Sequence, residues 1–95
     1  LQFSGPFCSY CDAMRGILTG LAEELEGVSH REIDITDYPE LTSALRISQT
    51  PTTLLVTSSG HLHSRIRGAA PAATVREEVD HALEYRKAHY DDYLI

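Results

Sequence analysis

The chain has 95 residues, 42% of them hydrophobic, and a net charge of -6 from 8 basic and 14 acidic side chains. This length suits one domain with its own core, so we expect a single domain over residues 1–95. The negative charge would repel phosphate backbones and disfavours nucleic-acid binding. The longest strongly apolar run, Leu54 to Val56, is far too short to span a bilayer. The chain opens without Met at Leu1, so the hypothesis of an upstream signal peptide or membrane anchor stays open.

The first half of the chain predicts a strand, a helix, a second strand and a short helix. Residues 1–3 read as a strand, and a Gly-Pro turn separates them from an apolar stripe at helical spacing. The stripe consists of Met14, Ile17, Leu18, Leu21, Ala22 and Leu25. Residues 28–35 predict the second strand. Thr36 and Asp37 are candidate caps for a short helix that should end before Ile47.

The second half predicts a β-hairpin and a final helix. Residues 52–57 and 61–67 read as strands on either side of a Ser-Ser-Gly turn. Thr74 and Glu77 have the spacing of a capping box at the start of the last helix. The buried stripe of that helix would be Val75, Val79, Ala82 and Leu83. We expect residues 85–95 to form a C-terminal helical extension.

The order of these elements predicts an α/β fold. The first three strands are joined by helical crossovers, which implies parallel neighbours, whereas the tight turn between the last two strands implies an antiparallel pair. The expected architecture is therefore a mixed four-stranded sheet flanked by helices.

The two cysteines carry the clearest chemical signal. Cys8 lies just before the first helix and Cys11 about one turn into it, so their sulfur atoms can meet in a reversible disulfide. A thiol at a helix entrance faces unpaired N–H groups and the positive end of the helix dipole, which favour thiolate. Lowering a thiol pKa from about 8.5 to about 7 raises the thiolate fraction at neutral pH from roughly 3% to roughly 50%. We therefore expect Cys8 to attack and Cys11 to resolve the mixed disulfide.

Other interpretations of the pair remain open from the sequence. A Cys-x-x-Cys spacing also occurs in inert structural pairs and in zinc half-sites. His61 and His63 point to the same face of the predicted hairpin and could complete a metal site, although alternating His on a hairpin is usually solvated surface. The redox interpretation predicts neither a metal nor a cofactor.

The residues around the cysteines resemble the thioredoxin family over roughly residues 1–84. The resemblance rests on the run from Phe3 to Cys11, on Thr50-Pro51-Thr52 and on Gly68. It implies a thioredoxin-like fold that lacks the family's usual first strand and helix, and a cis Pro51 that faces the cysteines. It also implies substrate-binding positions at Phe7, Tyr10, Thr50, Pro51 and Gly68, with the backbone of Thr50 pairing with an extended substrate segment. The opening residues are similar to a bacterial group that often carries a membrane anchor upstream.

Two departures from the family pattern bear on the chemistry. Ser9 and Tyr10 stand between the cysteines where thioredoxins usually have Gly-Pro, which resembles the glutaredoxin dipeptide and leaves the redox potential open. Gln2 stands where the family has a buried acid. An amide cannot accept the proton of the resolving thiol, and we expect it to hydrogen-bond to a water or to the thiol.

The leading hypothesis is a thiol–disulfide oxidoreductase that reduces protein disulfides, with an electron donor such as a thioredoxin reductase and a cytoplasmic, or membrane-tethered, location. One alternative is a glutaredoxin-like enzyme, weakened because Gly68-Ala69-Ala70 stands where glutaredoxins carry Gly-Gly. The other is a protein-binding module with a dispensable disulfide. Its support is the aromatic and apolar tail formed by Tyr85, Tyr90, Tyr93, Leu94 and Ile95.

Overall fold

The computed structural model of the protein describes the backbone of residues 1–88 and the side chains of residues 1–85. The elements follow in the predicted order of strands and helices. They are β1 (Gln2–Ser4), α1 (Ser9–Glu24), β2 (Glu32–Asp34), α2 (Pro39–Ala44), β3 (Thr52–Val56), β4 (Leu62–Arg67) and α3 (Ala72–Ala88).

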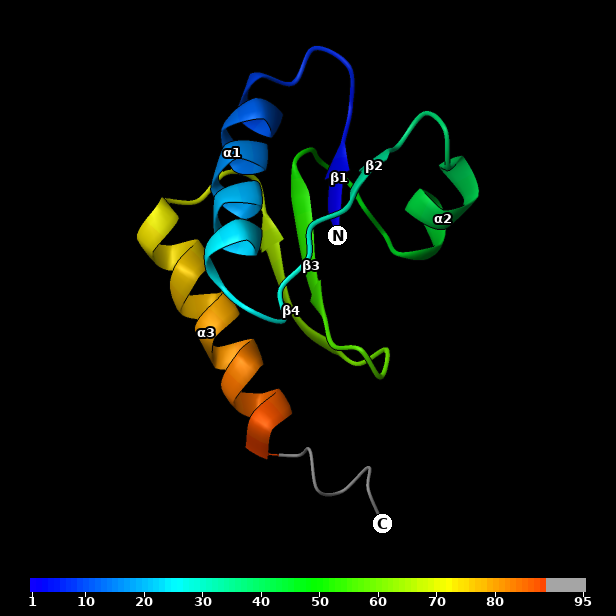
Figure 1. Ribbon diagram of the computed structural model, residues 1–95. Coiled ribbons are helices and arrows are strands. Elements are labelled where there is room, and N and C mark those ends of the chain that lie inside the picture. The colour runs from blue at the N-terminus through cyan, green and yellow to red at the C-terminus, as the bar shows by residue number, and fades with distance from the viewer. Residues whose placement is uncertain (89–95) are drawn as a thin grey trace.

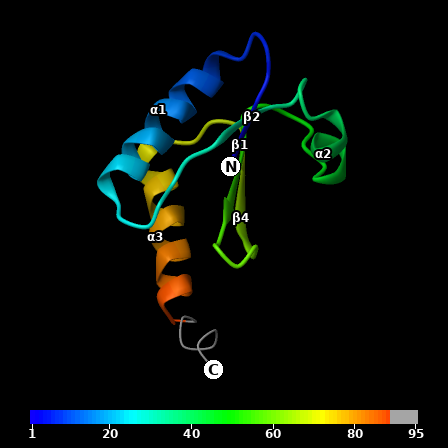
Figure 2. The ribbon, with the colours of Figure 1, turned by 45° about the vertical axis from the view of Figure 1, so that its right-hand side comes forward.

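The strands form one mixed four-stranded sheet in the order β2-β1-β3-β4. β1 runs parallel to β2 and antiparallel to β3, and β3 and β4 form the expected antiparallel hairpin. Figure 1 shows α1 and α3 side by side, and Figure 2 shows α2 on the opposite side of the sheet. The α/β fold and the mixed four-stranded sheet are confirmed, but the expectation that the first three strands run parallel is wrong, because β3 runs antiparallel to β1.

The main core lies between the sheet and the pair α1 and α3. Its buried members are Met14, Leu18, Leu21, Val75 and Val79. The first three belong to the predicted stripe of α1, and the last two to the predicted stripe of α3. α2 has no buried residue, so it contributes little to this core. The helical periodicity of apolar residues therefore predicts the buried faces of α1 and α3 correctly.

Three predicted boundaries were wrong. The second strand covers only Glu32–Asp34, because only these residues pair with the three-residue strand β1. α2 begins after Tyr38, and no side chain caps it. The carboxylate of Asp34 instead accepts hydrogen bonds from Thr36, in the turn before the helix. α3 begins at Ala72, so Thr74 lies inside the helix and is not its cap.

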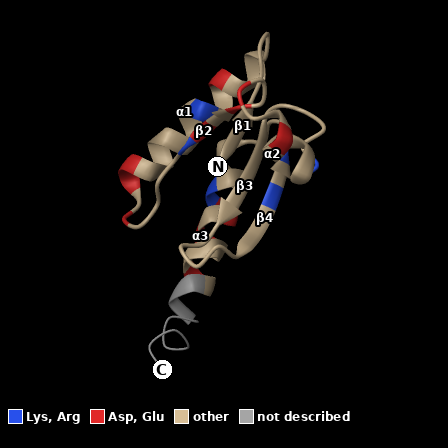
Figure 3. Ribbon diagram, turned by 90° about the vertical axis from the view of Figure 1, so that its right-hand side faces the viewer, with Lys and Arg blue, Asp and Glu red and all other residues tan. Residues whose placement is uncertain are grey.

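The C-terminal extension is described only in part. α3 continues through Tyr85 to Ala88, and residues 89–95, with Tyr90, Tyr93, Leu94 and Ile95, lie outside the described residues. Among the described residues, no helix is long and apolar enough to cross a membrane. In the described part of the chain, the basic segments are spread over several elements (Figure 3).

The packing predicts unequal effects of truncating two apolar side chains that both lie on helices. Met14 is fully buried in the core, whereas Leu41 of α2 is exposed. Met14→Ala should lower the free energy of unfolding by about 2–5 kcal/mol, because it leaves a cavity. Leu41→Ala should change it by about 0.5 kcal/mol or less. Urea denaturation measures both values, and equal losses would contradict this assignment of the core.

Candidate active site

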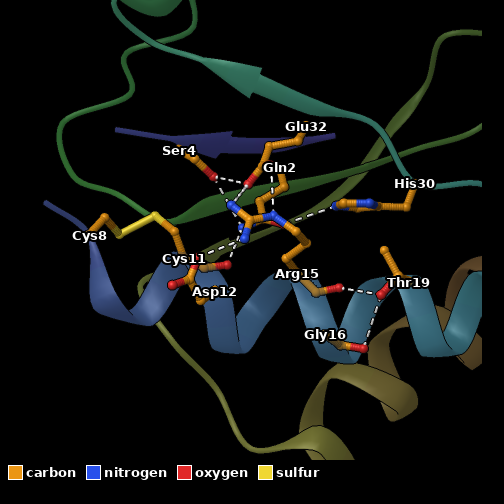
Figure 4. Close-up of polar contacts among 10 residues, drawn as sticks. All are labelled: Gln2, Ser4, Cys8, Cys11, Asp12, Arg15, Gly16, Thr19, His30 and Glu32. Atoms are coloured by element: carbon orange, nitrogen blue, oxygen red, sulfur yellow. Dashed lines mark hydrogen bonds and ion pairs between the residues drawn. A yellow bond between two sulfur atoms is a disulfide. The ribbon is translucent and has the colours of Figure 1, made fainter. Parts of the chain in front are cut away.

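The two cysteines form a disulfide at the start of α1. Cys8 is the N-cap of the helix, Cys11 lies in its first turn, and their Cα atoms are 5.3 Å apart. Cys8 is partly exposed, whereas Cys11 is 2% exposed. Figure 4 shows the disulfide at the end of the helix next to the sheet. The predicted spacing thus brings the sulfur atoms together, and Cys8 is the one that a partner can reach.

Two residues shape the loop from β1 to α1 and its surroundings. Phe7 has a positive φ of 57°, which places Cys8 at the entrance of the helix. A Cβ atom at Gly5 would lie 3.3 Å from Cδ1 of Ile35 and 3.4 Å from Oγ1 of Thr50. The lack of a side chain at Gly5 therefore allows the chain around Thr50 to approach this loop closely.

The segment that precedes β3 lies at the same end of the sheet. The pairing of Phe3 with Thr52 places the start of β3 beside the end of β1, from which the chain leads to Cys8. The Thr50–Pro51 peptide bond is cis, as the resemblance implies. The N–H of Gly68 donates to the carbonyl of Pro51 at 2.7 Å. β1, β3 and the end of β4 thus bring Thr50, Pro51 and Gly68 to the end of the sheet that bears the cysteine loop.

Two aromatic side chains flank the disulfide and face solvent. Phe7, directly before Cys8, is fully exposed, and Tyr10, between the cysteines, is 65% exposed. An open hollow beside them is lined by both cysteines and by Arg15, one turn further along α1. Exposed aromatic side chains and an open hollow thus border the disulfide.

Gln2 lies behind the cysteine pair and is completely buried. Its Nε2 donates to the carbonyl oxygen of Cys11 at 2.9 Å and to Oγ of Ser4 at 3.2 Å. Its Oε1 can only accept, so Nε2 of His30 donates to it at 2.9 Å. The expectation that this amide would bond to a water or to the thiol is therefore wrong: both of its N–H groups have protein partners.

An ion-pair cluster extends this network to the surface (Figure 4). Oγ of Ser4 donates to Oε2 of Glu32 at 2.6 Å. Arg15 holds both carboxylate oxygens of Glu32 at 2.8 Å and one of Asp12 at 2.6 Å. The Arg15 guanidinium keeps the pKa of Glu32 below its usual value, so this carboxylate is ionised at neutral pH.

His30 closes the network on the other side of Gln2. Burial lowers the pKa of His30 below its ordinary value, so the ring is neutral at neutral pH. Its single ring proton is on Nε2, because that atom donates to Gln2. A neutral imidazole at this place adds no charge beside the buried amide of Gln2.

Ser4, Arg15, His30 and Glu32 belong to the site, although the sequence pattern did not predict them there. The sequence could have predicted one of these contacts, the ion pair of Asp12 and Arg15, because the two residues are three apart on a helix. The others depend on the register of β1 against β2, which brings Ser4 and Glu32 to one face of the sheet. His61 and His63 lie elsewhere, against the ring of Tyr85 at centroid distances of 5.2 and 6.0 Å.

The fold and the site together define a class: thioredoxin-fold proteins with a Cys-x-x-Cys disulfide at a helix entrance. The family model described as Thioredoxin matches residues 1–81. The chloroplastic thioredoxin Y2 of Arabidopsis thaliana is 30% identical over 88 residues, which cover 92% of this chain and 52% of that protein. The chain belongs to the thioredoxin family, and it spans about half the length of that relative.

Solved thioredoxin structures have the same fold. The oxidized mitochondrial thioredoxin 3 of Saccharomyces cerevisiae superposes with a TM-score of 0.71 at 26% identity, over 83% of this chain and 74% of that one. Thioredoxin 1 of Thermosipho africanus gives a TM-score of 0.76 at 19% identity, over 90% of this chain and 94% of that one. The likeness to the second protein concerns the fold alone.

The unequal burial of the two cysteines predicts unequal reactivity after reduction. Cys8 should alkylate first and have a pKa below that of a free cysteine, since it caps the helix and is the more exposed thiol. Alkylation rates measured against pH, with the labelled cysteine located by mass spectrometry, test this. Faster labelling of Cys11, or a Cys8 thiol that titrates at about 8.5 as in free cysteine, would contradict it.

Proposed function

We propose that the protein is a thiol–disulfide oxidoreductase that reduces protein disulfides through Cys8 and Cys11. The observation that carries the proposal is the disulfide itself, with a partly exposed Cys8 at the N-cap of α1 and a buried Cys11 one turn further. In the reduced protein, the helix N-terminus favours the thiolate of Cys8, the nucleophilic form.

Catalysis takes two exchanges. In the first, the Cys8 thiolate attacks a partner disulfide, forms a mixed disulfide and releases one partner sulfur with its electron pair. In the second, the Cys11 thiolate attacks Cys8, forms the Cys8–Cys11 disulfide and releases the other partner sulfur. Two protons leave the cysteine thiols and two are taken up by the partner sulfurs. One partner disulfide is thus reduced while the Cys8–Cys11 dithiol is oxidised.

The surface around the disulfide supports a role for the predicted substrate-binding residues. Phe7 and Tyr10 would contact apolar side chains that flank the target disulfide. The segment of Thr50 and Pro51 would align an extended substrate backbone in the manner of an added strand. Gly68 would support this segment, because its N–H binds the Pro51 carbonyl.

The proposal includes the partners and the location of the protein. Substrates are proteins with accessible disulfides, and a donor of the thioredoxin reductase class would regenerate the dithiol, since each turnover consumes two electrons. We place the protein in the cytoplasm, free or tethered to a membrane, because thiols are kept reduced there.

An insulin reduction assay tests the proposal. The wild-type protein should accelerate the reduction of insulin disulfides by dithiothreitol, and Cys8→Ser should lower the rate to that of dithiothreitol alone, because the attacking thiol is lost. Circular dichroism checks that the variant is folded. A Cys8→Ser protein as active as the wild type would refute the assigned nucleophile, and no acceleration by the wild type would favour the binding-module alternative.

A further inference from the structure

The orientation of the Gln2 side chain follows from the groups that surround it. Glu32 is ionised and offers only acceptor atoms, so the hydroxyl of Ser4 must donate to it. Ser4 can then only accept a hydrogen bond from Gln2, which turns Nε2 toward Ser4 and Cys11. His30 donates to Oε1 and fixes the opposite side of the same amide.

The reverse orientation of the amide would be costly. With Oε1 toward Cys11, two carbonyl oxygens would face each other in a site that water does not reach, and both partners would lose a hydrogen bond. The Cys11 carbonyl can only accept a hydrogen bond, and Ser4, whose hydroxyl donates to the Arg15-bound Glu32, favours the same orientation by accepting from Nε2.

We propose that Gln2 is a positioning residue for the resolving thiol, oriented by the hydrogen-bonded chain from Glu32 through Ser4. The amide anchors the backbone of Cys11 against β1 by its hydrogen bond to the carbonyl. When Cys8 is in a mixed disulfide, this anchor keeps the Cys11 sulfur within reach of Cys8. Resolution depends on this proximity, because a small displacement of a reacting group can slow its reaction by orders of magnitude.

The inference rests on the proposed thiol–disulfide exchange and concerns its second step only. The hydrogen bonds of the Gln2 side chain go to Ser4, Cys11 and His30, and Cys8 is not among these partners. A change in Ser4 should therefore leave the reactivity of Cys8 unchanged and slow only the attack by Cys11. A general structural defect would affect both steps, so the two rates separate positioning from stability.

The experiment follows the reaction of the reduced protein with oxidised glutathione. Cys8 displaces one glutathione and forms an adduct, from which Cys11 then displaces the second glutathione. Acid quenching and mass spectrometry give the amounts of reduced, glutathionylated and disulfide protein over time. A separate alkylation measurement reports the reactivity of Cys8.

Ser4→Ala should slow the decay of the adduct by about 10- to 100-fold while the alkylation rate of Cys8 stays within about twofold of the wild type. Ser4→Thr keeps a hydroxyl and should retain the wild-type rate. Thr42→Ala, which removes a hydroxyl that binds the backbone of α2, is the matched control and should also match the wild type.

An adduct that decays at the wild-type rate in folded Ser4→Ala would overturn the inference, as would a Ser4→Thr protein as slow as Ser4→Ala. If Ser4→Ala does not fold, Glu32→Gln provides the second test. The amide introduced at position 32 could donate to the Ser4 hydroxyl, so Ser4 would no longer have to accept a hydrogen bond from Gln2. We therefore again expect slower decay of the glutathione adduct, and an unchanged decay rate would refute the inference. A wild-type protein that forms no adduct on Cys8 would instead refute the proposed exchange itself.

Discussion

The burial of β1 in the middle of the sheet is the constraint on which the site depends. This three-residue strand pairs on both sides, with β2 and with β3, and its three side chains are all buried. Gln2 and Ser4 are polar and buried, and each would cost roughly 1–3 kcal/mol if it were left without hydrogen bonds. The groups that satisfy them are the Cys11 carbonyl, His30 and Glu32, which ties α1 and β2 to the strand that leads to Cys8.

The small stabilisation energy of exposed ion pairs indicates what the ion pairs at this site do. Arg15 and Glu32 are partly exposed, and exposed ion pairs contribute only about 0–1 kcal/mol to stability. The bidentate geometry of the pair is specific, however, and it keeps Glu32 in its acceptor-only form beside Ser4. The cluster therefore matters more for the orientation of the buried amide than for the stability of the fold.

Much of the fold followed from the sequence because apolar periodicity and turn residues are local signals. Met14, Leu18 and Leu21 repeat at helical spacing and are buried, and the cysteine spacing placed both sulfur atoms at the entrance of α1. The contacts of Gln2 could not be predicted in this way, because they depend on the register of the strands and on His30, which lies in the connection between α1 and β2. The start of α3 was also missed, since Thr74 has a capping pattern that the structure does not use.

We propose that Cys8 attacks and Cys11 resolves, and trapping the mixed disulfide tests this division most directly. Reduced Cys11→Ser and Cys8→Ser proteins would each be mixed with a peptide that contains a single disulfide, and the covalent adducts identified by mass spectrometry. We expect a stable adduct on Cys8 in Cys11→Ser, because the resolving thiol is gone, and little adduct in Cys8→Ser, because Cys11 is buried. Equal adduct in both variants, or adduct only in Cys8→Ser, would contradict this division of roles.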